Sequence, residues 1–333
     1  MKVCIYGLGA VGGLIAARIA RSGQPVSALA RGAMLEAVRR DGLTLLEGGA
    51  DGERRTVVPL EVSDRPADLG PQDLVILTVK TTALGSVARD IAPLLGPQTT
   101  VLSTMNGVPW WFFHGLDPRF AGVSLRSVDP DGAIAAAIPA ARVLGCVTHL
   151  SCTTPAPGVV RHGFGDRLIV GEPVGGSSAR CDAAAGLLAR AGFQCEITPR
   201  IQQEIWLKLW GNMTMNPVSA LTGATADRIL DDDRVRDFMS AAMLEAARIG
   251  EAIGLAVGMT PEERHAVTRK LGAFRTSMLQ DVEGGRPLEL DALVAAVAEM
   301  GRLTGVPTPS IDALFGLARL FASVRGLYPS GSR

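Results

Sequence analysis

The feature that most constrains the fold of this chain is a glycine-rich turn near its N-terminus, between a strand pattern and a helix pattern. The apolar run 2–7 predicts a strand, and the small-residue run from Ala10 to Ser22 predicts a helix. Between them stands Gly-Leu-Gly-Ala-Val-Gly, and a second strand pattern follows at 26–30. Strand, Gly-x-Gly-x-x-Gly, helix and second strand within about thirty residues are typical of a dinucleotide-binding unit.

The three glycines of this turn have separate roles. Gly7 permits the tight turn, Gly9 lets a pyrophosphate approach the backbone, and Gly12 allows the helix to pack closely on the strand. The helix N-terminus adds amide donors and the positive end of its dipole. We therefore predict that the cofactor-binding turn consists of Gly7, Leu8, Gly9, Ala10, Val11 and Gly12.

The residues after the second strand indicate which dinucleotide binds. Proteins that prefer NAD usually carry Asp or Glu at this place, whereas this chain has Ala30-Arg31-Gly32. Arg31 can pair with a 2′-phosphate through charge-assisted hydrogen bonds, so NADP is predicted rather than NAD. Lys80, which ends the apolar run 74–80, is a second candidate for phosphate binding, and an exposed lysine at a strand end is the alternative.

The rest of the chain separates into two kinds of pattern. Up to residue 198, strand and helix patterns alternate, which predicts a parallel sheet with right-handed crossovers. Within this part, 43–63 reads as two strands of an inserted hairpin or antiparallel edge, and 142–173 extends the sheet. From Arg200 on, helical periods dominate at 201–215, 234–254, 261–282, 289–304 and 310–324. We predict an α/β Rossmann-type domain at 1–198 and an all-α helical domain at 199–333, with a disordered end at 329–333.

Composition limits the class of partner. Lysine plus arginine and aspartate plus glutamate both total 33, so no global positive field attracts nucleic acid or anionic lipid, and a small molecule is the expected partner. The cysteines form no Cys-x-x-Cys pair, which argues against a metal site or a disulfide framework and favours a reduced, cytoplasmic compartment. No apolar run reaches the ~18 residues of a membrane span. Residues 3–17 imitate a secretory signal, but their four glycines favour a folded first unit.

A second group of polar residues stands in the helical half. Lys208, Asn212 and Asn216 are four residues apart, so they share one side of a helix that is otherwise rich in Trp, Leu and Met. The alternative is an exposed face on which Glu204 and Lys208 form an ordinary ion pair. Because Asn216 precedes Pro217, we expect the helix to bend or end there.

Four motifs together resemble a known family. They are the opening GLGAVGG, Met105-Asn106-Gly107 at a strand end, Lys208…Asn212…Asn216-Pro217, and residues 276–281 followed by 285–291. In this order they are similar to the ketopantoate reductase family, whose members reduce 2-dehydropantoate with NADPH in pantothenate biosynthesis. The resemblance covers nearly the whole chain.

The resemblance implies roles for particular residues. It assigns the general acid to Lys208, whose ammonium would protonate the developing alkoxide, and assigns to Glu289 the acceptance of a substrate hydroxyl. Both units contribute to the implied site, which would lie in a cleft between them. The other implied substrate contacts are Asn106, which would also meet the nicotinamide, Asn212, Asn216 and the carboxylate-side donor Ser277.

Some positions depart from the pattern of the pantothenate-pathway members. Phe274 and Val294-Ala295 replace polar or small residues, and Trp110-Trp111-Phe112-Phe113 is an unusual aromatic run. Core packing is the favoured interpretation of the run, and a larger apolar pocket wall is the alternative. Two other functions therefore stay open, a reductase of another branched or aromatic 2-oxo acid and a non-catalytic NADP(H)-sensing protein. The apolar helical half also makes a homodimer an expectation.

Overall fold

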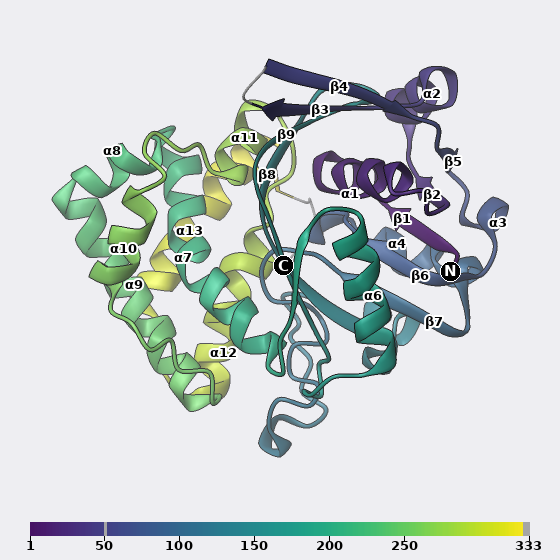
Figure 1. Ribbon diagram of the computed structural model, residues 1–333. Coiled ribbons are helices and arrows are strands. Elements are labelled where there is room, and N and C mark those ends of the chain that lie inside the picture. Colours follow the sequence, from purple (N-terminus) through teal and green to yellow (C-terminus); the bar gives the residue numbers. More distant parts are fainter. Residues whose placement is uncertain (50–51, 329–333) are drawn as a thin grey trace. The chain divides into compact units, whose positions relative to one another are not determined.

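The computed structural model describes residues 1–49 and 52–328, so the predicted disordered end lies outside the described residues. The chain forms two compact units (Figure 1). The first comprises Met1–Met105 and Ala133–Ile201, and the second comprises Asn106–Gly132 and Gln202–Arg333. The sequence predicted a single domain boundary at residue 198. In the structure, the segment Asn106–Gly132 belongs to the second unit although it lies within the first domain in sequence.

One mixed sheet of ten strands, counted within the described residues, forms the first unit. Its order is β4-β3-β9-β8-β7-β6-β1-β2-β5, and β10 pairs with β9. β1 is parallel to β2 and β6, whereas β3–β4 and β8–β9 are antiparallel, as the predicted edge hairpin and sheet extension require. The strands are β1 (Val3–Tyr6), β2 (Val26–Leu29), β3 (Leu43–Gly49), β4 (Gly52–Val58), β5 (Glu61–Ser63), β6 (Gln72–Leu77), β7 (Leu95–Ser103), β8 (Val143–Ala156), β9 (Val159–Gly171) and β10 (Gln194–Ile197).

The interval 43–63 contains three strands, not the two expected. Pro59 interrupts the second apolar run, because proline cannot donate to a strand ladder. The chain then continues into β5, which pairs with β2 at the other edge of the sheet.

Helices cover the sheet of the first unit. They are α1 (Ala10–Arg21), α2 (Gly32–Asp41), α3 (Pro66–Leu69), α4 (Leu84–Asp90), α5 (Ala133–Ala137) and α6 (Ala179–Arg190). α1 lies against the sheet in Figure 1 and buries Leu14, Ile15 and Ile19 completely. Its apolar face thus joins the main hydrophobic core of the unit.

A buried ion cluster fixes α1 to two strands. Arg18, only 6% exposed, donates to Glu47 of β3 at 3.0 Å and to Asp166 of β9 at 2.5 Å. Arg21 and Arg54 also pair with Glu47. Burial raises the pKa of Glu47, but its arginine partners outweigh this and hold the pKa at about 2. Glu47 is therefore charged at neutral pH, and the cluster anchors the helix that follows the glycine-rich turn.

The second unit contains helices and no strand within its described residues. Its helices are α7 (Ile201–Thr222), α8 (Ala226–Asp231), α9 (Asp233–Ala252), α10 (Pro261–Arg269), α11 (Ser277–Glu283), α12 (Ala296–Thr304) and α13 (Pro309–Val324), with a π-helical turn η5 (Asp291–Ala295) before α12. The predicted helical stretch 261–282 is split into α10 and α11 by a loop in which Gly272 has a positive φ of 62°. Figure 1 shows these helices in green to yellow. No described helix is both long and apolar enough to cross a membrane.

We expected the helix to bend or end at Asn216. α7 runs through Pro217 to Thr222, so the helix does not end there. Proline removes one backbone donor and disfavours the helical conformation of the residue before it. Met213 and Val218, on either side of Pro217, are nevertheless buried in the unit. Burial of this apolar surface outweighs the local cost of the proline.

The segment Asn106–Gly132 belongs to the second unit because its aromatic residues pack there. Trp110, Trp111, Phe112 and Phe113 are all buried, and the Phe112 ring centroid lies 6.2 Å from that of Trp206 in α7. The favoured interpretation of the aromatic run as core packing is confirmed. Further along the segment, Glu299 of α12 accepts hydrogen bonds from the backbone amides of 126 and 127.

Two glycines of the N-terminal turn differ sharply in the space around them. A Cβ on Gly12 would overlap the Gly7 carbonyl oxygen and the Thr78 hydroxyl, so helix and strand meet there with no room for a side chain. A Cβ on Gly9 would meet no atom within 4 Å. Close packing therefore requires glycine at residue 12 and not at residue 9.

Gly12→Ala should lower the free energy of unfolding by about 1–3 kcal/mol, because the added methyl group forces α1 away from β1. Gly9→Ala, the matched control, should change it by less than about 1 kcal/mol. Chemical denaturation of the three proteins measures both values. Equal destabilisation by the two substitutions would contradict the packing argument.

Candidate active site

The glycine-rich turn is held at the carboxyl ends of three strands. Gly7 has a φ of +107°, which favours glycine, and its amide and that of Leu8 donate to the Leu29 carbonyl at 3.2 and 3.1 Å. The Thr78 hydroxyl donates to the Gly7 carbonyl at 2.6 Å. Thr78 stands just after β6 and carries no motif that would have singled it out in the sequence.

The first turn of α1 fits a phosphate group. Gly9 precedes the helix, presents no capping side chain and leaves open space above the backbone. Ala10, Val11 and Gly12 form the first helical turn, whose amides point to that space as in any helix N-terminus. These residues are therefore suited to hold the pyrophosphate of a dinucleotide.

A cavity of about 300 Å³ opens beside this turn, at the carboxyl ends of β1, β2 and β6, where parallel sheets bind ligands. Arg31 lines it, is 65% exposed and donates to Asp90 at 3.2 Å. Asp64 also lines it, a residue that sequence reasoning missed because it stands far from Arg31 in the chain. Lys80 occupies the N-cap position of the following 3₁₀ turn, η1 (Thr81–Ala83), one residue beyond the lining residue Val79.

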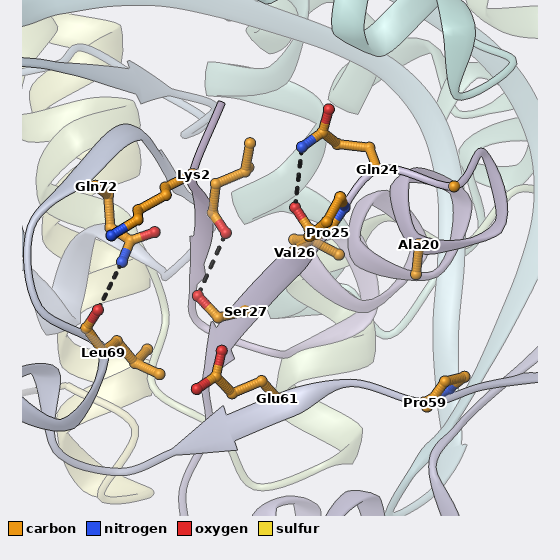
Figure 2. Close-up of a pocket in the computed structure, with 12 residues that line it drawn as sticks. Lys2, Ala20, Gln24, Pro25, Val26, Ser27, Pro59, Glu61, Leu69 and Gln72 are labelled. Atoms are coloured by element: carbon orange, nitrogen blue, oxygen red, sulfur yellow. Dashed lines mark hydrogen bonds between the residues drawn. The ribbon is translucent and has the colours of Figure 1, made fainter.

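A second cavity, of about 550 Å³, lies at the opposite edge of the same sheet. Val3, Val26 and Gln72, the first residues of β1, β2 and β6, line it. Figure 2 shows that polar groups here bond within the protein: Gln72 donates to the Leu69 carbonyl at 2.9 Å and Ser27 to the Val3 carbonyl at 3.3 Å. This cavity lies at the amino ends of the strands, whereas parallel sheets bind ligands at the carboxyl ends, and its polar groups are already paired. We therefore do not assign the predicted site to it.

In the second unit, the Lys208 ammonium donates to the Asn106 side-chain oxygen at 2.8 Å. Asn106 is held by the next two residues. Gly107 has a φ of +80°, and a Cβ there would lie 2.7 Å from the Ala292 carbonyl oxygen; the Val108 amide donates to that same oxygen at 2.9 Å. The loop that carries Asn106 is thus fixed on η5, and it presents the asparagine to α7.

Asn216 and Ser277 are positioned from the C-terminal half of α7. Asn216 is only 5% exposed, and its carbonyl accepts from the Ser219 hydroxyl at 2.8 Å. The Ser219 hydroxyl also hydrogen-bonds to that of Thr276, which caps the start of α11. Ser277 is the exposed first residue of α11, so this contact fixes its backbone close to α7. Asn212 lies one turn before Asn216 on α7 and is half-buried.

Glu289 is buried, with 9% exposure, just before η5. The Leu288 amide donates to the Leu327 carbonyl at 2.9 Å, and the Tyr328 hydroxyl donates to Asp291 at 2.5 Å. Burial raises the pKa of Asp291, and the Tyr328 hydrogen bond opposes that shift. The C-terminal residues therefore position the Glu289 segment, a role that nothing in the sequence pattern of 327–328 indicates.

The structure groups the predicted residues as follows. Gly7, Leu8 and Arg31 line one cavity in the first unit. Lys208 and Asn106 touch in the second unit, and η5 carries both the Asn106 loop and the segment that begins at Glu289. π-helical turns are rare in proteins overall, and those that occur are often found at functional sites. An ammonium group next to an amide, with a buried carboxyl on the adjoining segment, suits proton donation to a carbonyl oxygen.

Comparison with known proteins shows the family to which the chain belongs. The N-terminal family model "Ketopantoate reductase PanE/ApbA" matches residues 3–175, and its C-terminal counterpart matches residues 200–322. The chain is 44% identical over 329 residues to the 2-dehydropantoate 2-reductase of Mesorhizobium japonicum, covering 98% of this chain and 100% of that protein.

Solved structures agree in fold. A protein assigned as a ketopantoate reductase from Ralstonia solanacearum MolK2 is 55% identical with a TM-score of 0.92, covering 98% of this chain and 99% of that one. A D-mandelate dehydrogenase, solved with NADH and anilino(oxo)acetate, shares the fold at 20% identity and a TM-score of 0.82, covering 98% and 100%. Matching family models, a full-length relative and the paired Lys208 and Asn106 lead to one conclusion: this chain is an oxidoreductase that belongs to the ketopantoate reductase PanE/ApbA family.

Proposed function

We propose that this oxidoreductase reduces 2-dehydropantoate to pantoate with NADPH. Bound NADPH would supply a hydride for the C2 carbonyl carbon, and the Lys208 ammonium would give a proton to the carbonyl oxygen. The observation that carries this proposal is the 2.8 Å hydrogen bond from Lys208 to Asn106, since it holds the acid in place before substrate binds.

The first unit supplies the cofactor site in this proposal. The amides of the α1 N-terminus would hold the pyrophosphate, and the cavity lined by Arg31 would take the adenosine end. The Arg31 guanidinium pairs with Asp90 at the surface, where its side chain is 65% exposed. Because this ion pair is exposed, Arg31 could release Asp90 and bind a 2′-phosphate in its place. Asp64 in the same cavity would instead accept hydrogen bonds from the ribose hydroxyls and so favour NADH.

The second unit supplies the substrate residues in this proposal. Asn106 would orient the nicotinamide and the carbonyl, and Ser277 would donate to the carboxylate. Asn212 and Asn216 would bind along the substrate from α7. Glu289, which is 9% exposed, would accept the hydroxyl that distinguishes 2-dehydropantoate from simple 2-oxo acids.

The packing of the aromatic residues favours this substrate over a larger apolar one. Phe274 packs against the cluster of Met215, Val218 and Leu314, and the run 110–113 is buried. These side chains are filling the helical core, so they offer little reason to expect a widened apolar pocket. The departures from the family pattern therefore have a packing explanation.

A panel of 2-oxo acids with NADPH tests the proposed substrate. We expect kcat/KM for 2-dehydropantoate to exceed that for 2-oxoisovalerate at least tenfold, because the missing hydroxyl leaves the buried Glu289 acceptor unpaired, a loss of about 1–3 kcal/mol. Glu289→Ala should erase most of this preference. Faster reduction of phenylpyruvate would instead assign an aromatic substrate, and NADPH binding without any turnover would support a sensing protein.

Lys208→Ala should lower kcat by about 10²–10⁴-fold and leave the Kd of NADPH nearly unchanged, because the substitution removes the proton donor and no cofactor contact. Glu204→Ala, one turn earlier on α7, is the matched control and should have a mild effect. Steady-state kinetics and cofactor titration provide both numbers. Wild-type turnover in the Lys208 variant would remove it from the chemical step.

Arg31→Ala should weaken NADPH binding by about 1.5–3 kcal/mol and leave NADH binding unchanged, because only NADPH carries the 2′-phosphate. Asp64→Asn is the control, since it alters the same cavity and should not weaken NADPH. Calorimetric titration of both cofactors into the three proteins measures the effects. Equal losses for the two cofactors in the Arg31 variant would rule out recognition of the 2′-phosphate.

A homodimer remains part of the proposal. Leu317, Leu320 and Val324 lie along one face of α13 and are 61%, 63% and 76% exposed. Exposed apolar residues at this spacing are typical of a helix that packs against a partner, and a second copy of the chain is the simplest one.

A further inference from the structure

Arg264 of α10 packs against the backbone of α7 beside the predicted catalytic residues. A Cβ on Gly211 would lie 2.6 and 2.7 Å from Nη2 and Nε of Arg264, so the guanidinium occupies the place of a side chain at that position. Gly211 is three residues after Lys208 and directly precedes Asn212. Since residues three apart share a helix face, the guanidinium lies within one turn of the side of α7 that carries Lys208 and Asn212.

Arg264 differs from the other arginines of the second unit in its surroundings. Among those in the described residues, only Arg236 and Arg264 are not exposed, and Arg236 is paired with Asp233 at 2.5 Å. The Arg264 side chain makes no hydrogen bond or ion pair with any described residue. Burial lowers its pKa, and no neighbouring acid offsets this.

A guanidinium that is partly removed from water and makes no hydrogen bond within the described residues gains stability from a ligand that brings a negatively charged acceptor. Arginine presents a planar fork of donors that matches a carboxylate in a bidentate arrangement. A 2-oxo acid always brings a carboxylate next to the carbonyl that Lys208 would protonate. Ligand and cation therefore complement each other in charge and in shape.

We propose that Arg264 binds the carboxylate of the 2-oxo acid substrate, with Gly211 keeping the space that its guanidinium needs. This inference rests on the proposed reductase function and adds a specificity-determining residue to it. Arg264 selects 2-oxo acids over uncharged ketones, while Lys208 carries out the proton transfer.

Arg264→Met tests the proposal against a control on the same helix. Arg269→Met is that control, because Arg269 is exposed and paired with Asp231. We expect Arg264→Met to raise the KM for 2-oxoisovalerate about tenfold to hundredfold, with a smaller change in kcat. The wild type should prefer 2-oxoisovalerate over its uncharged methyl ester, and the variant should lose most of that preference. A merely structural role would affect acid and ester alike.

Gly211→Ala gives a second, independent test, since its methyl group would displace the guanidinium. Alone it should raise the KM for 2-oxoisovalerate as Arg264→Met does, whereas in the Arg264→Ala background the same change should add little, because the space is then empty. Additive effects of the two substitutions would overturn the proposal, as would an unchanged preference for acid over ester in Arg264→Met.

Binding separates this inference from the proposed function. The Kd of pantoate in the presence of NADP, measured by calorimetry, needs no turnover and should rise about tenfold or more in Arg264→Met. A wild type that binds pantoate in this way but reduces no 2-oxo acid would refute the reductase function and keep the carboxylate site. A wild type that turns over while Arg264→Met keeps its pantoate Kd would refute the carboxylate site alone.

Discussion

The hydrogen bond between Lys208 and Asn106 is the interaction on which the substrate half of this protein depends. It joins residues 102 positions apart, and it requires a loop that lies close against η5. Gly107 makes that close approach feasible, since its positive φ and the nearby Ala292 carbonyl leave no room for a Cβ. The C-terminal residues Leu327 and Tyr328 in turn hold the segment around η5. The Lys208 ammonium and the Asn106 amide are thus held in place by a chain of backbone contacts, which pre-organises the pair.

The cofactor half depends on a comparable close approach in the first unit. Gly12 lets α1 meet β1, Gly7 turns the chain, and the Thr78 hydroxyl fixes the Gly7 carbonyl. The cluster around Arg18 and Glu47 then anchors α1 to the antiparallel part of the sheet. In both units, glycines allow backbone groups to come close to the place where a ligand would bind, because they have no side chain. Buried polar contacts then hold these backbone groups in position.

Several features were accessible from sequence because short-range patterns determine them. The glycine spacing identified the turn and α1, hydrophobic periodicity separated the mixed sheet from the helical unit, and the four-residue spacing placed Lys208, Asn212 and Asn216 on α7. Pro217 does not end α7, since its local preference is outweighed by the burial of residues on both sides of it. The interval 43–63 contains a third strand that was not expected, because β5 pairs with β2 and not with its neighbour in the chain.

By itself, the sequence determined the family and the fold class, since these follow from local spacing and from motifs in a fixed order. It also predicted the residues of the candidate site. Tertiary structure decided which groups meet. It moved Asn106–Gly132 into the second unit, placed Arg264 over Gly211 and brought Tyr328 to Asp291. Periodicity shows which face of an element is apolar, but the partner of that face depends on packing among segments that are distant in sequence.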